Sequence, residues 1–307
     1  MMNPTATPLT IAVSGATGLV GSALVPRLEA AGHTVRRLVR RAAERPSEVS
    51  WRPREGTVDI EALRGVDAVV HLAGESIAEG RWTAEKKMRI RESRVDGTRT
   101  IAAAVAELDP PPRVLVATSA IGYYGDRGAA QLDETSPPGE GFLVEVCRAW
   151  EAATQPARDA GVRVVNGRLG MVLSRHGGAL AKMLLPFKLG VGGRVGSGKQ
   201  YLSWITIDDA ASAFALAVED DRLTGPVNFV APDPVTNAEF TKTLGRVLRR
   251  PTILPMPAAA ARIAFGQMAD ELLLASSRVV PVRLTEARFT FDHPQLEGAL
   301  RHVLRRE

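Results

Sequence analysis

The 307-residue sequence has one cysteine, Cys147, and only 5% aromatic residues. A single cysteine excludes a disulfide within the chain and is typical of proteins from the reducing cytoplasm, where we expect this one to reside. No stretch reaches the roughly 18 consecutive apolar residues of a membrane span. The first residues, MMNPTATPLT, lack the basic start and apolar run of a signal peptide. We therefore expect no membrane association.

The five histidines are scattered, with no pair at metal-ligand spacing, so we expect no metal site. The formal net charge of +5 can attract anionic ligands. The sequence has neither a basic tail nor aromatic residues interleaved with basic ones, which nucleic-acid grooves generally combine. These features favour a small-molecule partner over a nucleic acid, and they leave a homo-oligomer open.

Apolar runs typical of buried strands alternate with amphipathic helical patterns over the first 170 residues. The expected strands are 9–14, 33–39, 66–72, 113–119 and 162–169, and the expected long helices are 83–108 and 142–160. This alternation predicts an α/β fold with a Rossmann-type, doubly wound parallel sheet and right-handed crossovers.

A glycine turn follows the first expected strand. Its spacing places Gly15 at the tight turn, Gly18 at the point of contact and Gly21 where the next helix meets the strand. A diphosphate on a helix N-terminus needs backbone N–H groups at close range, which side chains would block. The turn therefore predicts dinucleotide binding, with a ligand-free βα turn as the alternative.

Arginine occupies the end of the second expected strand, where NAD-specific sites usually place an acidic residue. The guanidinium of Arg40 could bind a 2′-phosphate through two hydrogen bonds, which favours NADP(H) as cofactor. The alternative is a surface arginine in a protein that binds NAD equally well. Leu72, Ala73 and Gly74 end the third expected strand and would let the cofactor lie against the sheet, while Arg94 could reach its phosphates.

After Gly170 the pattern changes. Seven glycines between residues 176 and 204 indicate loops that shape a pocket, and residues 205–218 predict a strand end and a helix capped by Asp208 or Asp209. The sequence TNAE from Thr236 to Glu239 predicts a capping box. We expect a dinucleotide-binding domain of residues 1–170 with 205–232 returning to it, and a smaller substrate-binding lobe of residues 171–204 and 233–307.

Several motifs resemble the short-chain dehydrogenase/reductase superfamily in its extended or atypical branch, and most closely an epimerase-like family with a distinctive C-terminal domain. They include SGATGLVG at 14–21, LAGESI at 72–77, IRESRVDGTR at 90–99, TSAIGYYG at 118–125, FLVEVCRAWE at 142–151 and ADELLLASSRVVPVRL at 269–284. The resemblance implies a C-terminal lobe that closes a pocket over the nicotinamide of NADP. It places on cofactor positions Gly15, Thr17, Gly18, Leu19, Val20, Arg40, Leu72, Ala73 and Arg94, with Arg168 near the nicotinamide.

The sequence departs from the superfamily pattern at the positions that usually carry the catalytic residues. Typical members carry serine, tyrosine and lysine, the last two spaced Tyr-x-x-x-Lys. Aligned through Glu151 and its neighbouring tryptophan, the tyrosine position falls on Leu143, the lysine position on Cys147 and the serine position on Ala120. Neither Leu143 nor Cys147 can serve as the usual acid/base pair.

Four nearby residues could replace the missing groups. They are Ser119, Tyr123, Tyr124 and Glu145, each with a structural alternative: a strand-end cap, loop packing for the two tyrosines, and an exposed helix position. The favoured interpretation is an NADP(H)-binding, epimerase-like oxidoreductase acting on a small polar substrate, which fold-level analogy suggests is a nucleotide sugar. The alternative is a non-catalytic protein that senses NADP(H) or mediates an interaction.

Overall fold

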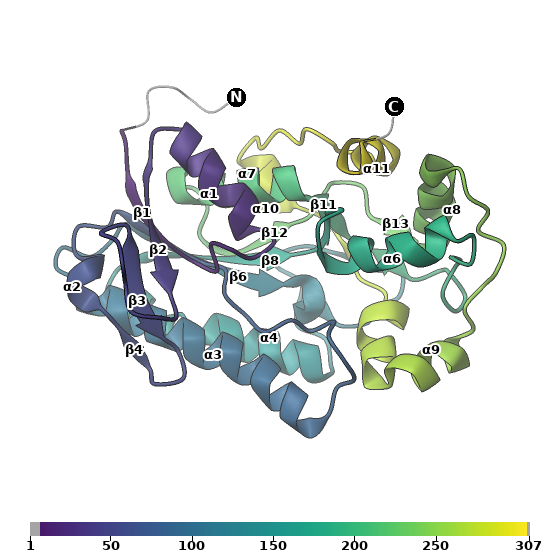
Figure 1. The fold of residues 1–307 in the computed structure, drawn as a ribbon, viewed down its shortest axis with the longest axis horizontal. Coiled ribbons are helices and arrows are strands. Elements are labelled where there is room, and N and C mark those ends of the chain that lie inside the picture. The colour runs from purple at the N-terminus through teal and green to yellow at the C-terminus, as the bar shows by residue number, and fades with distance from the viewer. Residues whose placement is uncertain (1–6, 306–307) are drawn as a thin grey trace.

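The computed structural model describes residues 7–305, and an eight-stranded sheet runs through its larger part (Figure 1). The strand order is β12-β8-β6-β5-β1-β2-β3-β4, and neighbours are parallel except β4, which is antiparallel to β3. The strands are β1 (Thr10–Ser14), β2 (Thr34–Val39), β3 (Glu48–Arg52), β4 (Thr57–Val58), β5 (Ala68–His71), β6 (Val114–Ala120), β8 (Arg163–Leu169) and β12 (Gly225–Phe229). The predicted Rossmann-type fold is confirmed.

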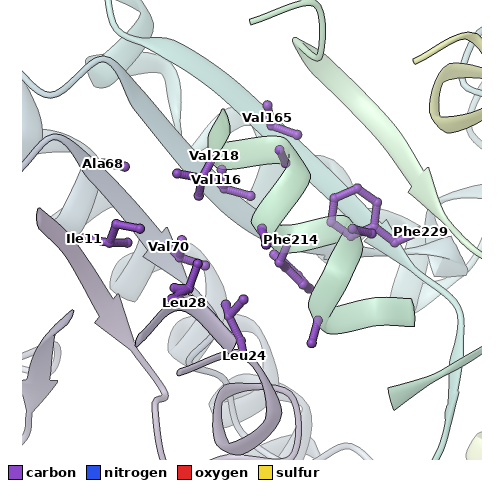
Figure 2. Packing of buried hydrophobic residues seen from close by; sticks show 14 of the residues in the cluster. Ile11, Leu24, Leu28, Ala68, Val70, Val116, Val165, Phe214, Val218 and Phe229 are labelled. Atoms are coloured by element: carbon purple, nitrogen blue, oxygen red, sulfur yellow. The ribbon is translucent and has the colours of Figure 1, made fainter. Parts of the chain in front are cut away.

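Helices cover both faces of the sheet, as Figure 1 shows. The first face carries α1 (Gly21–Ala30) and α7 (Ile207–Glu219); the second carries α3 (Ala84–Glu107), α4 (Phe142–Ala152) and α5 (Gln155–Asp159), with the short α2 (Ile60–Leu63) near its edge. Alternate residues of each strand pack on opposite faces. Ile11 of β1 joins Leu24 and Phe214 on the first face (Figure 2), while Ala12 joins Ile101 on the second.

The direction of strand order reverses at β1. The chain first moves outward to β2 and β3, and then crosses back to β5 on the other side of β1. In open α/β sheets, ligands bind in the crevice outside the carboxyl ends of the strands at such a reversal. The loops after β1 and β5 are therefore where a site is expected.

The smaller lobe lies at the right of Figure 1. It contains α6 (Gly178–Lys188), α8 (Asn237–Leu248) and α11 (Leu296–Leu304), packed around Trp204, Phe240 and Leu300. Its other helical elements are α9 (Ala258–Phe265) and η2 (Ala269–Leu274). The short helix α10 (Val282–Glu286) instead packs on β12, and its Leu284 joins the core of the first face. Three short strand pairs complete the fold: β9 (Met171–Leu173) with β11 (Trp204–Thr206), β10 (Tyr201–Leu202) with β13 (Val235–Thr236), and β7 (Gln131–Leu132) with β14 (Arg278–Val279). The domain boundaries remain predictions.

Two local expectations were wrong. The helix expected at 142–160 is interrupted between α4 and α5, where Thr154 bonds back to the carbonyl of Glu151 (2.7 Å) and Pro156 has no N–H to continue the ladder. The cap of α7 is Thr206, whose hydroxyl accepts the N–H of Asp209 (3.0 Å), rather than either aspartate. The capping box at Thr236 is confirmed.

Candidate functional site

In the glycine turn between β1 and α1, neighbouring backbone atoms lie so close that side chains would not fit. Gly15 has a φ of +66°, and a Cβ added to it would lie 2.9 Å from the backbone nitrogen of Ala73. A Cβ added to Gly21 would lie 2.2 Å from the carbonyl oxygen of Gly15. Backbone conformation and packing both require glycine at position 15, and packing of the helix against the turn requires it at position 21.

The turn presents backbone donors at the start of α1. The N–H of Gly18 donates to the carbonyl of Gly15 (2.9 Å), whereas those of Leu19 and Val20 have no acceptor within residues 7–305. The first turn of α1 carries no acidic side chain that would occupy this position. Because free N–H groups and the helix dipole favour negative charge, the turn fits the diphosphate of a dinucleotide.

A buried polar pair fixes the turn against the end of β5. The Ser14 hydroxyl accepts the N–H groups of Leu72 (3.2 Å) and Ala73 (3.4 Å), and it lies 2.7 Å from Nδ1 of His71. Burial lowers the pKa of His71 to about 4. The imidazole is therefore neutral near pH 7 and shares one hydrogen bond with the Ser14 hydroxyl.

An open cavity of about 1450 Å³ lies along this edge of the sheet. Seven of the predicted cofactor residues line it: Gly15, Thr17, Gly18, Arg40, Leu72, Ala73 and Gly74. Leu19 instead contacts the start of α6, because its Cδ2 lies 3.2 Å from where a Cβ on Gly178 would be, and Val20 caps α1. The cavity is also bounded by α3 and by the turn that joins β3 to β4.

The arginines around the end of β2 differ in how they are paired. Arg41 donates to both carboxylate oxygens of Glu48 (2.9 and 2.7 Å), and this lowers the pKa of Glu48 to about 2. Arg37 pairs with Glu29 (2.9 Å). Arg40 is exposed in the cavity and has no ion-pair or hydrogen-bond partner in the described part of the chain. Its guanidinium is therefore free for a ligand.

Arg94 enters the same region from α3. Its Nη1 donates to the carbonyl of Glu75 (3.0 Å), and its Cζ lies 5.0 Å from the centre of the Trp150 ring. A Cβ on Gly74 would lie 3.5 Å from the same Cζ atom. Burial lowers the pKa of Arg94. The guanidinium is thus held at the end of β5 with donors to spare.

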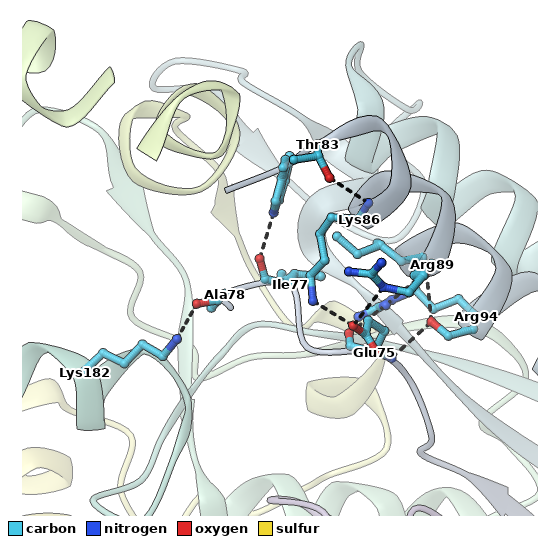
Figure 3. A network of polar contacts seen from close by, with 11 residues as sticks. Glu75, Ile77, Ala78, Thr83, Lys86, Arg89, Arg94 and Lys182 are labelled. Carbon is cyan, nitrogen blue, oxygen red and sulfur yellow. Dashed lines mark hydrogen bonds and ion pairs between the residues drawn. The ribbon is translucent and has the colours of Figure 1, made fainter. Parts of the chain in front are cut away.

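The carboxylate of Glu75 is bound by other cations, as Figure 3 shows. Lys86 Nζ lies 2.8 Å from its Oε1 and Arg89 Nε lies 3.7 Å away. Arg94 has no carboxylate at ion-pair distance within residues 7–305. Arg94 does not itself line the cavity, but its guanidinium lies beside Gly74, which does. The charge of Glu75 offsets only part of the cost of burying this cation, so its position suits an anionic ligand nearby.

At the carboxyl end of β6, five side chains form one network. The Ser119 hydroxyl donates to Oε1 of Glu151 (2.7 Å), and Arg168 binds both oxygens of that carboxylate (2.8 and 2.9 Å). Arg168 also donates to the Tyr124 hydroxyl (3.0 Å), which donates to Oδ1 of Asn228 (2.7 Å). The network joins β6, β8, α4 and β12.

This network holds Ser119 and Tyr124 in structural contacts. Tyr124 is fully buried, and burial raises its pKa to about 12. Burial lowers the pKa of Arg168, but the hydrogen bonds and charge of Glu151 more than offset this, so the net shift is upward. Arg168 is therefore a permanent buried cation, and Tyr124 holds its proton.

Tyr123 and Glu145 are placed differently. The ring centre of Tyr123 lies 3.5 Å from Cζ of Arg168, and its hydroxyl has no partner among the described residues. Glu145 is exposed on α4, and its side chain has no hydrogen-bond or ion-pair partner within the described chain. The structure brings Ser119, Tyr123 and Arg168 together and leaves Glu145 apart from them.

The two substituted positions on α4 are buried in packing. A Cβ on Gly122 would lie 3.4 Å from Cβ of Leu143 and 3.7 Å from Sγ of Cys147, so both side chains pack beneath the turn η1 (Ile121–Tyr124). Burial raises the pKa of the Cys147 thiol to about 12. Neither residue can exchange a proton with a substrate near pH 7.

A carboxylate from the C-terminal lobe caps α4. Glu271 of η2 accepts the N–H groups of Phe142 (3.2 Å) and Leu143 (2.8 Å) through its two oxygens. No side chain next to the helix start does this. Such a cap stabilises a helix by roughly 1 kcal/mol.

The sequence did not single out several of these residues. Glu151 belongs to a quoted motif, but its partner Arg168 is 17 residues away on another element. Asn228 offers a weak signal, an amide within the apolar strand β12, and Ser14 and His71 show a similar one at strand ends. Their roles depend on which strands are neighbours.

Comparisons with known proteins agree with this geometry. Residues 11–230 match the model of the NAD dependent epimerase/dehydratase family, and residues 256–303 match a domain of unknown function, DUF1731. The Epimerase family protein Mb2239 of Mycobacterium bovis is 46% identical over 96% of this chain and 98% of its own. No helix within residues 7–305 is long and apolar enough to cross a membrane.

Two solved structures support the same assignment. The crystal structure of the human epimerase family protein SDR39U1 with NADPH has a TM-score of 0.88 and 35% identity, covering 97% of this chain and 99% of the human one. A nucleoside-diphosphate sugar epimerase from Corynebacterium glutamicum has a TM-score of 0.81 and 40% identity, covering 97% of this chain and 58% of that one. From the matched model, the relatives and the sheet order, the chain belongs to the NAD dependent epimerase/dehydratase family, in the extended short-chain dehydrogenase/reductase superfamily.

Proposed function

We propose that the protein is an NADP(H)-dependent oxidoreductase of the epimerase type, acting on a small polar substrate with an alcohol or ketone at its reacting carbon. The observation that carries the proposal is the hydroxyl of Tyr123, which has no hydrogen-bond partner within residues 7–305 and belongs to a ring stacked on Arg168. The glycine turn and Arg40 support the cofactor, and the human relative was crystallised with NADPH. When bound, the nicotinamide gives or takes a hydride.

Tyr123 is the proton donor in this proposal. On reduction, the carbonyl carbon of the substrate receives the hydride while its oxygen takes the Tyr123 proton, which solvent later replaces. The guanidinium of Arg168 lies over the Tyr123 ring in a cation–π contact, which fixes the position of the phenol. Glu151 and Ser119 hold Arg168 in that position, so they are positioning residues.

A nucleotide sugar is the proposed class of substrate. The Corynebacterium glutamicum relative is described as a nucleoside-diphosphate sugar epimerase, which favours a nucleotide sugar. The basic character of the chain also suits an anionic substrate. A panel of nucleotide sugars and simple carbonyl compounds, incubated with NADPH labelled at C4, tests this class by transfer of label.

With whichever compound receives label, Tyr123→Phe is expected to lower kcat by roughly 100-fold or more, because general-acid catalysis contributes about 10²- to 10⁴-fold. Its affinity for NADPH should stay within about twofold. Glu145→Gln is the matched control, since Glu145 is exposed on α4, and it should keep kcat. Wild-type turnover by Tyr123→Phe would remove Tyr123 from the role of acid.

A non-catalytic NADP(H) sensor is the second candidate. It is favoured by the burial of Leu143 and Cys147 and by the use of Ser119 and Tyr124 in structural contacts. It predicts tight NADPH binding with no label transfer to any compound and capture of a partner protein that depends on the cofactor. Label transfer that requires Tyr123 decides against it.

Arg40→Ala is expected to weaken NADPH binding about 10- to 100-fold and to leave NADH binding within about twofold, because only the 2′-phosphate loses its charged hydrogen bonds. Calorimetric titration with both nucleotides measures this. Arg45→Ala, an exposed arginine five residues further on, is the control and should match the wild type. Equal losses for NADPH and NADH would show that Arg40 does not read the 2′-phosphate.

A further inference from the structure

The β3–β4 turn forms part of the wall of the cavity that the glycine turn also lines. Its residues 53–56, Arg54 among them, line the cavity together with Arg40. In the parallel register of β2 and β3, Val39 lies opposite Ser50. The carboxyl end of β2, which continues into Arg40, therefore lies beside the strand that leads into this turn.

Trp51 anchors the base of the turn. It is only 3% exposed, its ring packs edge-on against His71 with centroids 5.6 Å apart, and a Cβ on Gly97 of α3 would lie 3.5 Å from its Cζ2 atom. Trp51 also pairs with Val58 across the hairpin. These contacts fix the hairpin relative to both β2 and α3, so the cavity wall that carries Arg54 is held in place.

Among the described residues that line the cavity, two arginines and one carboxylate, Glu92, have no ion-pair partner. Four of the lining carboxylates are bound by other cations: Glu48 by Arg41 (2.7 Å), Glu55 by Arg52 (3.2 Å), Glu75 by Lys86 (2.8 Å) and Asp96 by Arg99 (3.7 Å). Within residues 7–305, Arg54, like Arg40, lines the cavity without an ion-pair or hydrogen-bond partner. Both are exposed to an incoming ligand.

We infer that Arg54 binds the 2′-phosphate together with Arg40 and so contributes to the preference for NADPH over NADH. This inference rests on the proposed NADP(H) binding. A phosphomonoester carries a charge of about −1.5 to −2 near pH 7 and three strong acceptor oxygens. One guanidinium neutralises only part of that charge, whereas two from adjacent walls can donate to different oxygens.

The test is calorimetric titration of Arg54→Ala with NADPH, NADH and adenosine 2′,5′-bisphosphate, which carries the 2′-phosphate but no nicotinamide. We expect affinities for NADPH and the bisphosphate to fall about tenfold and that for NADH to change less than twofold. Arg52→Ala is the matched control, because Arg52 lies in the same hairpin but is bound to Glu55. It should leave all three affinities unchanged.

Equal losses for NADPH and NADH, no loss at all, or an identical loss in Arg52→Ala would overturn the inference. The double variant Arg40→Ala/Arg54→Ala adds a check, since two residues on one phosphate should show losses that do not simply multiply. These titrations involve no turnover, so a failure of the proposed hydride chemistry would not affect them. Wild-type protein that binds NADPH and NADH equally would instead refute the proposed NADP(H) preference itself.

Discussion

Gly21→Ala is expected to weaken NADPH binding by about 100-fold or more. The added Cβ would lie 2.2 Å from the carbonyl oxygen of Gly15 and 2.7 Å from Cα of Ala16, and both atoms belong to the backbone. Neither can rotate away as a side chain would, so the turn must move by the order of 1 Å. Such a shift moves the N–H groups of the turn out of hydrogen-bond reach of the diphosphate, and losing one or two bonds to a charged group, each worth about 1.5–3 kcal/mol, accounts for about 100-fold. Calorimetry with NADPH measures the loss.

Gly298→Ala separates this steric effect from the general effect of a new methyl group. Gly298 lies within α11, and a Cβ on it would meet nothing within 4 Å. Alanine there should stabilise the fold by roughly 0.5–1 kcal/mol, because glycine is a poor helix former, and should leave NADPH affinity unchanged. Equal NADPH affinities in the two variants would mean that the turn does not hold the diphosphate.

Glu151→Ala is expected to destabilise the fold by about 3–5 kcal/mol, because it leaves Arg168 buried without its counter-ion. The two side chains are 13% and 3% exposed, and the guanidinium contacts both carboxylate oxygens. Arg168 would also lose the support that holds it against Tyr123. Chemical denaturation gives the free energy of unfolding, and label transfer from NADPH should fall together with it.

Glu145→Ala is the matched substitution on the same helix. Glu145 is exposed and unpaired among the described residues, so its loss should change the free energy of unfolding by no more than about 0.5 kcal/mol. A loss of stability in Glu151→Ala no larger than that in Glu145→Ala would show that the bridge to Arg168 is not a buried ion pair in solution.

Short-range patterns carried most of the fold prediction. The strand, glycine turn and helix around Gly15 are set by residues within 30 positions of one another, and they lie where the periodicity placed them. The cap of α7 was misassigned because Asp209 looks like a cap in isolation. Its carboxylate instead accepts the N–H groups of Asp292 and His293, more than 80 residues further along the chain. Such a contact leaves no local signature.

The sequence predicted those site residues that directly follow the end of a single strand. Arg40 was identified because it follows β2 directly, whereas Arg54 reaches the same cavity through a hairpin that the sequence did not reveal. Around β6, the sequence offered Ser119 and Tyr124 as candidate catalysts. Only the three-dimensional pairing with Glu151 and Asn228 shows that their hydroxyls are already engaged.

The Glu271 contact links the segment that matches the epimerase family to the segment that matches DUF1731. Residue 271 belongs to the C-terminal DUF1731 segment. Its carboxylate nevertheless caps the N-terminus of α4, a helix of the epimerase segment that begins one residue before Leu143. A C-terminal segment that lacked this carboxylate would leave the N–H groups of Phe142 and Leu143 without their acceptor and so weaken the start of α4.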